Sequence, residues 1–395
     1  MNEHSKLVPF GSALRRPDPA RVAEFAETAR RLQRERAVSE DVVSGALRST
    51  PRASWARLSE RSELHTSGAL ERLGQEVELR RSSDPREALA IAEIASRIAD
   101  ALPNDAYPSI ILAQLRAHAW KDRSQALSYL GRYDEALRAL DRAEAQIDAY
   151  GTLAHDRAMV RLCRATLLQH LRRFDEAQSM LDECGRVFRS HGDEQTYVKC
   201  TLALGNLMVR RGDYRAARAI LAPLVTEPSL VGPHARMALG WCAIHLGAAD
   251  EAIEQFDEAA QDCRRLGREL ETVRANYGSG SAMLRLHRFR EAIAALLSTR
   301  EIFLSRGLVE EGGLSGLGIV EAHLVLGQAE AARQLAASLV REFSAANLNR
   351  RAVAALAYLS DAIVASNATP AIARDVHTYI VTLQTDPNCE FARAN

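Results

Sequence analysis

The sequence predicts an all-α protein, a right-handed superhelical solenoid built of antiparallel helix hairpins. Three observations lead to this prediction: a repeat with a period near 40 residues, small residues at fixed positions of that repeat, and a composition suited to helices. Apolar residues make up 47% of the 395 residues, enough to fill a core. Aromatic residues make up only 5%, which is low for a β-sandwich or a β-barrel.

The repeat appears when the chain is aligned on Glu-Ala or Ala-Ala pairs. We call the second residue of each pair the anchor of one unit and count positions from it. Consecutive anchors are 41, 40, 35, 40 and 40 residues apart. The six anchors are Ala136, Ala177, Ala217, Ala252, Ala292 and Ala332.

Other positions repeat with the anchor. Position −12 is small in five units, −5 is Gly in four, +4 is Leu or Phe in five, and +15 is Gly in five and Asn347 in the last. Gly at −5 and +15 is expected to end helices, because Gly readily adopts the left-handed conformation. Small residues at −12 and 0 let two helices approach closely. Each unit is therefore predicted to be a helical hairpin.

These residues resemble the tetratricopeptide repeat, with its Gly-x-Tyr-x-x-Ala turn, seen here at Gly131 to Ala136, and its small–small helix contact. Trp120 matches the aromatic residue near the start of that family's first helix. The resemblance covers about residues 115–350. The period near 40 is similar to the longer-helix variety of bacterial signalling regulators and kinesin light chain. Because solenoid units contact only their neighbours, we expect an elongated superhelix.

The flanking regions are less regular. Residues 67–101 are predicted to form a divergent hairpin, and residues 350–366 and 371–384 a last one opened by Pro370. Residues 19–36 and 39–48 are expected to form short helices outside the array. The predicted organisation is a basic helical or partly disordered segment at 1–62, the repeat array at 63–349, and a C-terminal capping hairpin and tail at 350–395.

Catalytic and cofactor motifs are missing from the sequence. No phosphate-binding loop, zinc-protease or hydrolase signature occurs, and the acidic pairs fall at predicted helix starts, where they cap. Cys242 and His245 share one helix face, but two ligands are too few for a structural zinc site. We expect no enzyme activity, no cofactor and no metal.

The charge balance and the cysteine spacing limit which classes of partner and which cellular compartment are expected. The 51 basic and 51 acidic residues balance, so no global field points to nucleic acid or an anionic membrane. The N-terminus lacks the apolar core of a secretory signal, and no apolar run of about 18 residues occurs. The six cysteines are irregularly spaced and read as core residues of a reducing compartment. A cytoplasmic protein is expected.

The first helices of the units should line the concave side of the solenoid. Positions −18, −15, −11 and −7 form one stripe down each first helix. The −18 row holds His118, Lys199, His234 and Arg274, and the −7 row holds His170, Arg210, His245 and Arg285. Neither row contains a carboxylate in the first five units, and a cleft of one sign attracts opposite charge. The sixth unit, with Leu314, Leu317, Glu321 and Val325, loses the pattern.

The predicted function is a non-enzymatic scaffold or regulator that binds an acidic or aromatic-containing protein segment in this groove. The resemblance to tetratricopeptide-repeat peptide clamps supports this role. The candidate groove residues are Lys121, Gln125, Tyr129, His170, Lys199, Asn206, Arg210, Trp241, His245, Arg274, Tyr277 and Arg285.

Two alternatives remain open. In the first alternative, the chain is a sensor of a peptide or small molecule and is coupled to a transcriptional or phosphorelay partner. In the second, it is the accessory subunit of an enzyme complex such as a protease or nuclease. Packing of residues 1–62 on the array favours the sensor.

Overall fold

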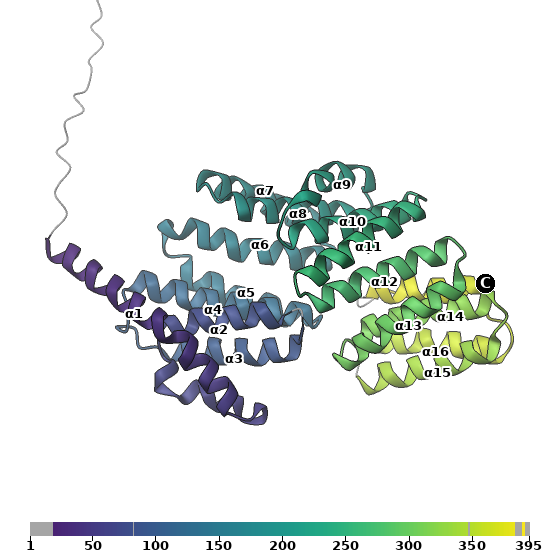
Figure 1. Ribbon diagram of the computed structural model, residues 1–395, viewed down its shortest axis with the longest axis horizontal. Helices are drawn as coiled ribbons and strands as arrows, with labels where there is room; N and C mark the ends of the chain where they lie inside the picture. The colour runs from purple at the N-terminus through teal and green to yellow at the C-terminus, as the bar shows by residue number, and fades with distance from the viewer. Residues whose placement is uncertain (1–18, 82, 347, 384–388, 392–395) are drawn as a thin grey trace, which may run out of the picture.

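The computed structural model describes residues 19–81, 83–346, 348–383 and 389–391. Within these ranges the secondary structure consists of α-helices and short 3-10 helices, without any strand. Consecutive helices pack as neighbours along the chain (Figure 1). The predicted all-α solenoid of helix hairpins is confirmed.

Each of the six predicted units forms one hairpin, and each anchor alanine is 0% exposed in the second helix of its unit. Two 17-residue helices and two three-residue turns make up the 40-residue period in the later units. The successive hairpins are α4 (Ser109–Tyr129) with α5 (Tyr133–Ile147), α6 (Ala154–His170) with α7 (Phe174–Ser190), α8 (Glu194–Arg211) with α9 (Tyr214–Leu221), α10 (Val231–His245) with α11 (Ala249–Arg265), α12 (Glu269–Arg285) with α13 (Phe289–Ser305), and α14 (Val309–Val325) with α15 (Ala329–Ala345).

The turn between the two helices of a unit depends on a left-handed residue. All four glycines at −5 have φ between +68° and +90°. The two units without this glycine place Arg172 and His287 in the same conformation, with φ of 55° and 58°. Gly at −5 therefore ends the first helix, as predicted.

The prediction for position +15 is wrong in two units. Gly151 begins a 3-10 turn because α5 already ends at Ile147, and Gly232 lies inside α10. In the second case α9 stops after eight residues and continues as the 3-10 helix Ala222–Thr226. This segment contains Pro223, which cannot donate a helical hydrogen bond. Asn347 lies outside the described residues.

The small residue at −12 accommodates the large residue at +4 of the same unit. A Cβ atom added to Gly240 would lie 2.8 Å from the ring of Phe256, and one added to Gly205 would lie 2.4 Å from Leu221. Phe256 also lies against Gly278 of the next unit's first helix. The repeat register predicted from the sequence thus sets the packing distance between the helices.

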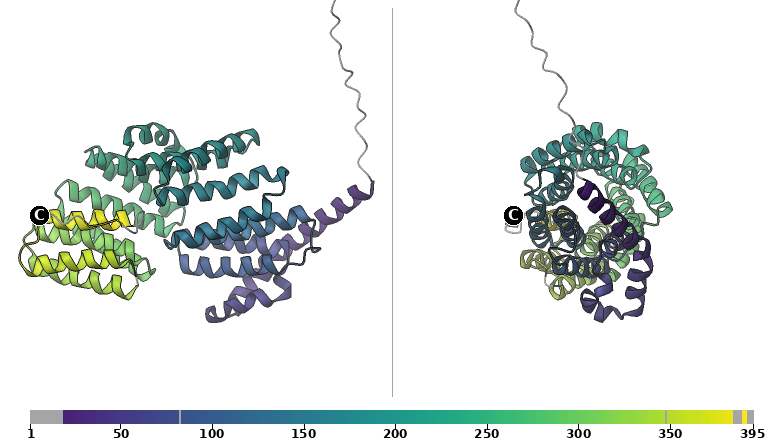
Figure 2. Two further views of the ribbon diagram at one scale, coloured as in Figure 1. Left: turned by 180° about the vertical axis from the view of Figure 1, so that it is seen from behind. Right: turned by 90° about the vertical axis from the view of Figure 1, so that its left-hand side faces the viewer.

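The N-terminal region begins with one continuous helix rather than two. The helix α1 (Pro19–Ser49) spans 31 residues, because no Gly or Pro interrupts the expected break near residue 37. Its C-terminal half packs on α2 (Ser67–Arg80), and the 3-10 helix Arg52–Glu60 packs on α3 (Pro85–Ala101). Trp55 and Leu58 are buried there. The first turns of α1 project away from the array (Figures 1 and 2), whereas Arg31 further along the helix donates a hydrogen bond of 2.8 Å to the Ala106 carbonyl.

The array returns upon itself after about one turn of the superhelix. Tyr129 and Leu130, at the end of α4, join a hydrophobic cluster with Leu270 of α12, Phe303 of α13 and Leu308. The end-on view of Figure 2 shows the hairpins arranged as a ring. The expectation that each unit contacts only its neighbours is therefore wrong at this closure contact, which we call the seam. The tight winding of the superhelix is the reason.

The C-terminal hairpin is arranged unlike the others. Whereas α16 (Arg350–Val364) packs on α15, α17 (Pro370–Leu383) turns back onto α14, the first helix of the sixth unit. Leu317 of α14 is 1% exposed in this contact, and Arg374 of α17 pairs with Glu321 at 2.7 Å. In the sixth unit α17 covers the middle of the stripe, where Leu317 and Glu321 are buried, whereas Val325 stays exposed.

No helix in the described ranges is both long and apolar enough to cross a membrane.

Candidate functional site: the inner wall of the solenoid

The first helices form the inner wall of the curved array. Successive first helices pack directly against one another, from α4 through α6, α8, α10 and α12 to α14, and they contact each other more closely than successive second helices do. In a curved two-layer array the layer with the closer neighbours is the concave one. The candidate residues at −18, −15, −11 and −7 lie on these inner helices.

Two members of the −18 row pair with acids of the following unit, whereas Lys199 is exposed and forms no ion pair with a described residue. His118 lies 2.8 Å from Asp156, and an Arg274 guanidinium nitrogen lies 3.4 Å from Glu311. Burial opposes ionisation of Asp156, but the hydrogen bonds to His118 and Gln114 lower the pKa of its carboxyl group. The sequence analysis missed these partners because they stand at −21, one helical turn outside the stripe. An acidic residue at −21 of the following unit was the sequence feature that could have indicated this pairing.

Three candidates of the first unit are engaged within the wall. Lys121 pairs with Asp122 at 2.8 Å, and Gln125 accepts a hydrogen bond of 2.9 Å from Arg81. The ring of Tyr129 lies between the guanidinium groups of Arg81 and Arg274, at 5.3 and 5.2 Å. These three side chains connect the wall to the seam.

Glu271 occupies the centre of the seam. Its Oε1 accepts a hydrogen bond of 3.2 Å from the Tyr129 hydroxyl, while its buried Oε2 has no hydrogen-bond partner among the described residues. His234, at −18 of the fourth unit, lies close by, and burial lowers the pKa of its imidazole despite the charge of Glu271. The seam therefore holds a buried, incompletely satisfied carboxylate that the sequence did not reveal.

The −7 row differs, because it contains stacked histidines and unpaired arginines. Tyr133 stacks on His170 with ring centroids 4.7 Å apart, and Tyr214 stacks on His245 at 4.5 Å. Arg210 and Arg285 are exposed and form no ion pair with a described residue. The nearest polar contact of Arg210 is His170, whose Nε2 lies 3.4 Å from its guanidinium nitrogen.

Burial decides the protonation state of this row. It lowers the pKa of His170 well below 6.5, with added effects from Arg210 and Arg274. It also lowers the pKa of His245, together with the charge of Arg285. Both rings are therefore neutral at pH 7, and the row owes its positive charge to the arginines.

Aromatic and amide side chains lie beside these arginines. Trp241 packs edge-on against Phe256 at 5.3 Å and lies 5.9 Å from Tyr277. The Tyr277 hydroxyl lies 3.0 Å from Nε2 of His377, a residue of α17 that the sequence analysis did not single out. Asn206 is half-buried on α8, and Lys199 is exposed near the start of that helix. Together they form a polar surface with an aromatic centre.

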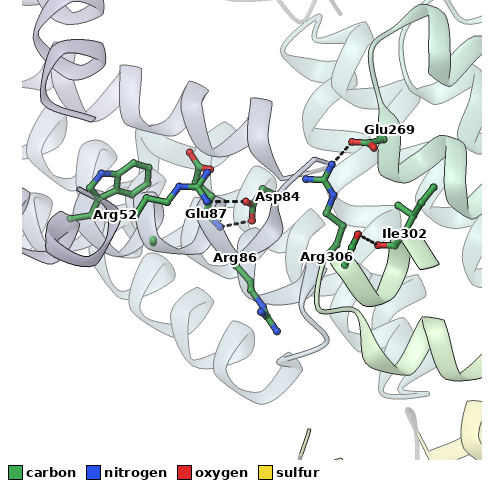
Figure 3. Close-up of a pocket in the computed structure, with 10 residues that line it drawn as sticks. Arg52, Asp84, Arg86, Glu87, Glu269, Ile302 and Arg306 are labelled. Atoms are coloured by element: carbon green, nitrogen blue, oxygen red, sulfur yellow. Dashed lines mark hydrogen bonds and ion pairs between the residues drawn. The ribbon is translucent and has the colours of Figure 1, made fainter. Parts of the chain in front are cut away.

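A separate pocket of about 530 Å³ opens along the seam (Figure 3). Its charges are largely paired within the protein, since Arg52 contacts Asp84 and Glu87, and Arg306 contacts Glu269. Arg86 extends between the two sides toward Gly307 at the end of α13. Because cations are favourable at helix C-termini, the position of Arg86 at the end of α13 stabilises the seam. Arg268 does likewise for α2, donating to the Glu78 carbonyl at 3.4 Å.

Comparison with known proteins agrees with this architecture. The family model "Tetratricopeptide repeat" matches residues 202–266. No curated protein sequence matches the chain.

Two solved structures share the fold. A signal transduction ATPase with a tetratricopeptide repeat sensor, from Pyrococcus horikoshii, has a TM-score of 0.54 at 14% identity, over 90% of this chain and 53% of its own. This chain thus spans about half of that protein. A Rap protein complexed with Competence and Sporulation Factor has a TM-score of 0.51 at 13% identity, over 85% of this chain and 99% of its own. The match over residues 202–266 and these two structures agree with the repeat offsets and the hairpin array, so the chain has the fold of a tetratricopeptide-repeat array.

Proposed function

We propose that this protein is a non-enzymatic regulator or scaffold that binds an acidic segment of another protein on its inner wall. The observation that carries the proposal is the pair of exposed arginines, Arg210 and Arg285, which lack an ion-pair partner in the described part of the chain. Unpaired positive charges on a concave surface attract ligands of the opposite sign. A planar guanidinium can hold a carboxylate with two parallel hydrogen bonds.

Neighbouring side chains suit a peptide. Asn206, four residues before Arg210 on α8, carries an amide that can bond a peptide backbone. Trp241 and Tyr277 present an aromatic surface for an apolar side chain. A tetratricopeptide-repeat array agrees with binding of a protein or peptide, whereas the acidic character of the ligand rests on the arginines. The cytoplasmic location remains a prediction from the sequence.

The test is affinity capture from the native host with the full chain as bait. Arg210→Glu combined with Arg285→Glu should abolish capture of the specific partner, because each reversal removes an attraction and adds a repulsion. The matched control reverses Arg138 and Arg215, exposed arginines on second helices without an ion pair to a described residue. Arg218 is unsuitable, because it pairs with Glu251 at 2.9 Å. Equal loss in both variants would overturn binding through the inner wall.

A second candidate function, sensing, is favoured by the N-terminal packing. Residues of α1 and the following 3-10 helices join the core of the first hairpins, so movement of the array reaches this segment. One protein of similar fold is described as having a tetratricopeptide repeat sensor, and another is in complex with a factor. In this role, ligand binding should change hydrogen exchange in residues 39–64. Unchanged exchange in a saturated complex would leave only the scaffold role.

A further inference from the structure

Histidine and arginine alternate along the −7 row, a pattern that a uniformly basic surface would not show. From the second to the fifth unit its residues are His170, Arg210, His245 and Arg285. The histidines occupy even-numbered units and the arginines odd-numbered ones. The two charges of this row therefore stand two units apart, on α8 and α12.

The histidines are fixed by a contact that also repeats. The aromatic residue at −3 of one unit stacks on the −7 residue of the next, as Tyr133 does on His170 and Tyr214 on His245. The second pair is almost parallel, with 5° between the ring planes. Ala249 takes the aromatic position before Arg285, so this arginine has no ring beneath it.

The other inner-wall charges are held within the protein. Arg274 is bound to Glu311, Lys121 to Asp122, and Arg81 to Gln125. Lys199 is exposed, but it stands eleven residues before Arg210, about 16 Å away along α8. Along the −7 row, a ligand meets only Arg210 and Arg285 as unpaired cations within the described residues.

The distance between these two arginines sets the spacing of the acids they select. Neighbouring packed helices lie about 8–10 Å apart, so two units along the wall correspond to about 16–20 Å. An extended chain advances about 3.3–3.6 Å per residue, so this distance corresponds to about five to six residues. Trp241 lies on the intervening helix α10, and its ring centroid is 5.9 Å from that of Tyr277 on α12.

From this alternation we infer that the ligand is an extended peptide with two acidic side chains about five to six residues apart and an apolar or aromatic side chain between them. One acid binds Arg210, the other binds Arg285, and the central side chain lies on Trp241 and Tyr277. This inference rests on the proposed function and makes it specific, because a diffuse acidic tail would satisfy a basic surface equally well at any spacing.

A series of synthetic peptides tests the spacing. Thirteen-residue fluorescent peptides carry a central Phe and two Glu residues two, four, six, eight or ten positions apart, in a Ser/Ala background. Binding to the full chain is measured by fluorescence anisotropy. Affinity should be highest at a separation of six, next at four, and at least tenfold lower at two and ten. The Arg210→Glu, Arg285→Glu chain should lose this maximum, while the Arg138→Glu, Arg215→Glu control keeps it.

The outcomes separate the two proposals. A maximum at four to six that depends on both arginines supports the inference. Binding that requires the arginines but is equal at all spacings overturns the inference and leaves the proposed function standing. Binding that ignores the arginines, or no binding by any peptide, overturns both.

Discussion

The two ends of the inner helices carry similar residues but use them differently. At the N-terminal ends, Arg274 and His118 of the −18 row pair with acids of the next unit and contribute to the wall itself, whereas Lys199 of the same row is exposed. At the C-terminal ends, the −7 row lacks such acids, so Arg210 and Arg285 remain available. A row of basic residues therefore indicates a binding surface only where the fold leaves the charges unpaired. The sequence alone treats both rows alike.

The largest expected effect concerns acid stability at the −7 end. Burial, and then Arg285, lower the pKa of His377 to about 4. A base whose folded-state pKa lies below its unfolded value of about 6.5 binds its proton better when unfolded. The free energy of unfolding is therefore unaffected by the titration of His377 above pH 6.5. As the pH falls toward 4, protonation of His377 in the unfolded chain lowers the free energy of unfolding by about 3 kcal/mol.

The His377→Gln variant sharpens this comparison. Its amide can still bond the Tyr277 hydroxyl but does not titrate, so its unfolding free energy should fall less than that of the original chain between pH 7 and pH 4. Urea unfolding at several pH values measures the difference. Parallel curves for the two proteins would show that burial does not lower the pKa of His377 in the folded protein.

The next prediction makes the −7 row resemble the −18 row. Asn206→Glu and Ser281→Glu each place a carboxylate four residues before a free arginine on the same helix. Such pairs form readily and stabilise a helix by about 0.3–0.5 kcal/mol. Ligand binding should weaken by about 1.5–3 kcal/mol, because the arginines no longer lack partners.

This design separates charge from folding. The double variant should melt no lower than the original chain, while its peptide affinity, measured by anisotropy, falls at least tenfold. Undiminished affinity at unchanged stability would mean that the ligand does not use these arginines.

A third prediction tests the register on which both rows depend. Gly240→Leu should destabilise the chain by about 1–3 kcal/mol, because the leucine side chain would overlap with the ring of Phe256. Gly45→Leu is the control, since no atom lies within 4 Å of a Cβ added there. Thermal unfolding measures both. Equal midpoints for the two variants would show that the −12 position does not face the +4 residue.

The smallest effect is expected at the −18 end. Asp156→Asn removes the charge that holds His118 and weakens two hydrogen bonds. It should cost about 1 kcal/mol of stability and leave the affinity for an acidic peptide unchanged. A large loss of affinity with little loss of stability would move the binding site to this row.

The repeat offsets predicted most of the fold because helix-ending and helix-packing signals are local. Gly at −5 and the small residue at −12 act within one hairpin, so their spacing can be found in the sequence. The seam could not be found in this way. The contact of Tyr129 with Glu271 joins residues 142 positions apart, and it depends on how tightly the superhelix winds.

The candidate site was predictable only as a surface. Helical spacing placed Arg210 and Arg285 on the inner wall, and the structure has them exposed there. The helical spacing did not reveal that the Tyr129 ring lies between Arg81 and Arg274, or that His377 lies beside the Tyr277 hydroxyl. The second contact exists because α17 packs on α14, and the hairpin pattern alone did not indicate this packing.

The most direct test of the inner wall as the binding surface exchanges one charge pair. With the peptide whose two Glu residues are six positions apart, Arg285→Glu should reduce the affinity at least tenfold. Replacing either Glu of the peptide by Lys, in two separate peptides, identifies the residue that meets position 285. One of these peptides should regain at least tenfold affinity for the Arg285→Glu chain while binding the original chain poorly. Failure of both peptides to regain affinity would contradict a direct contact between Arg285 and the ligand.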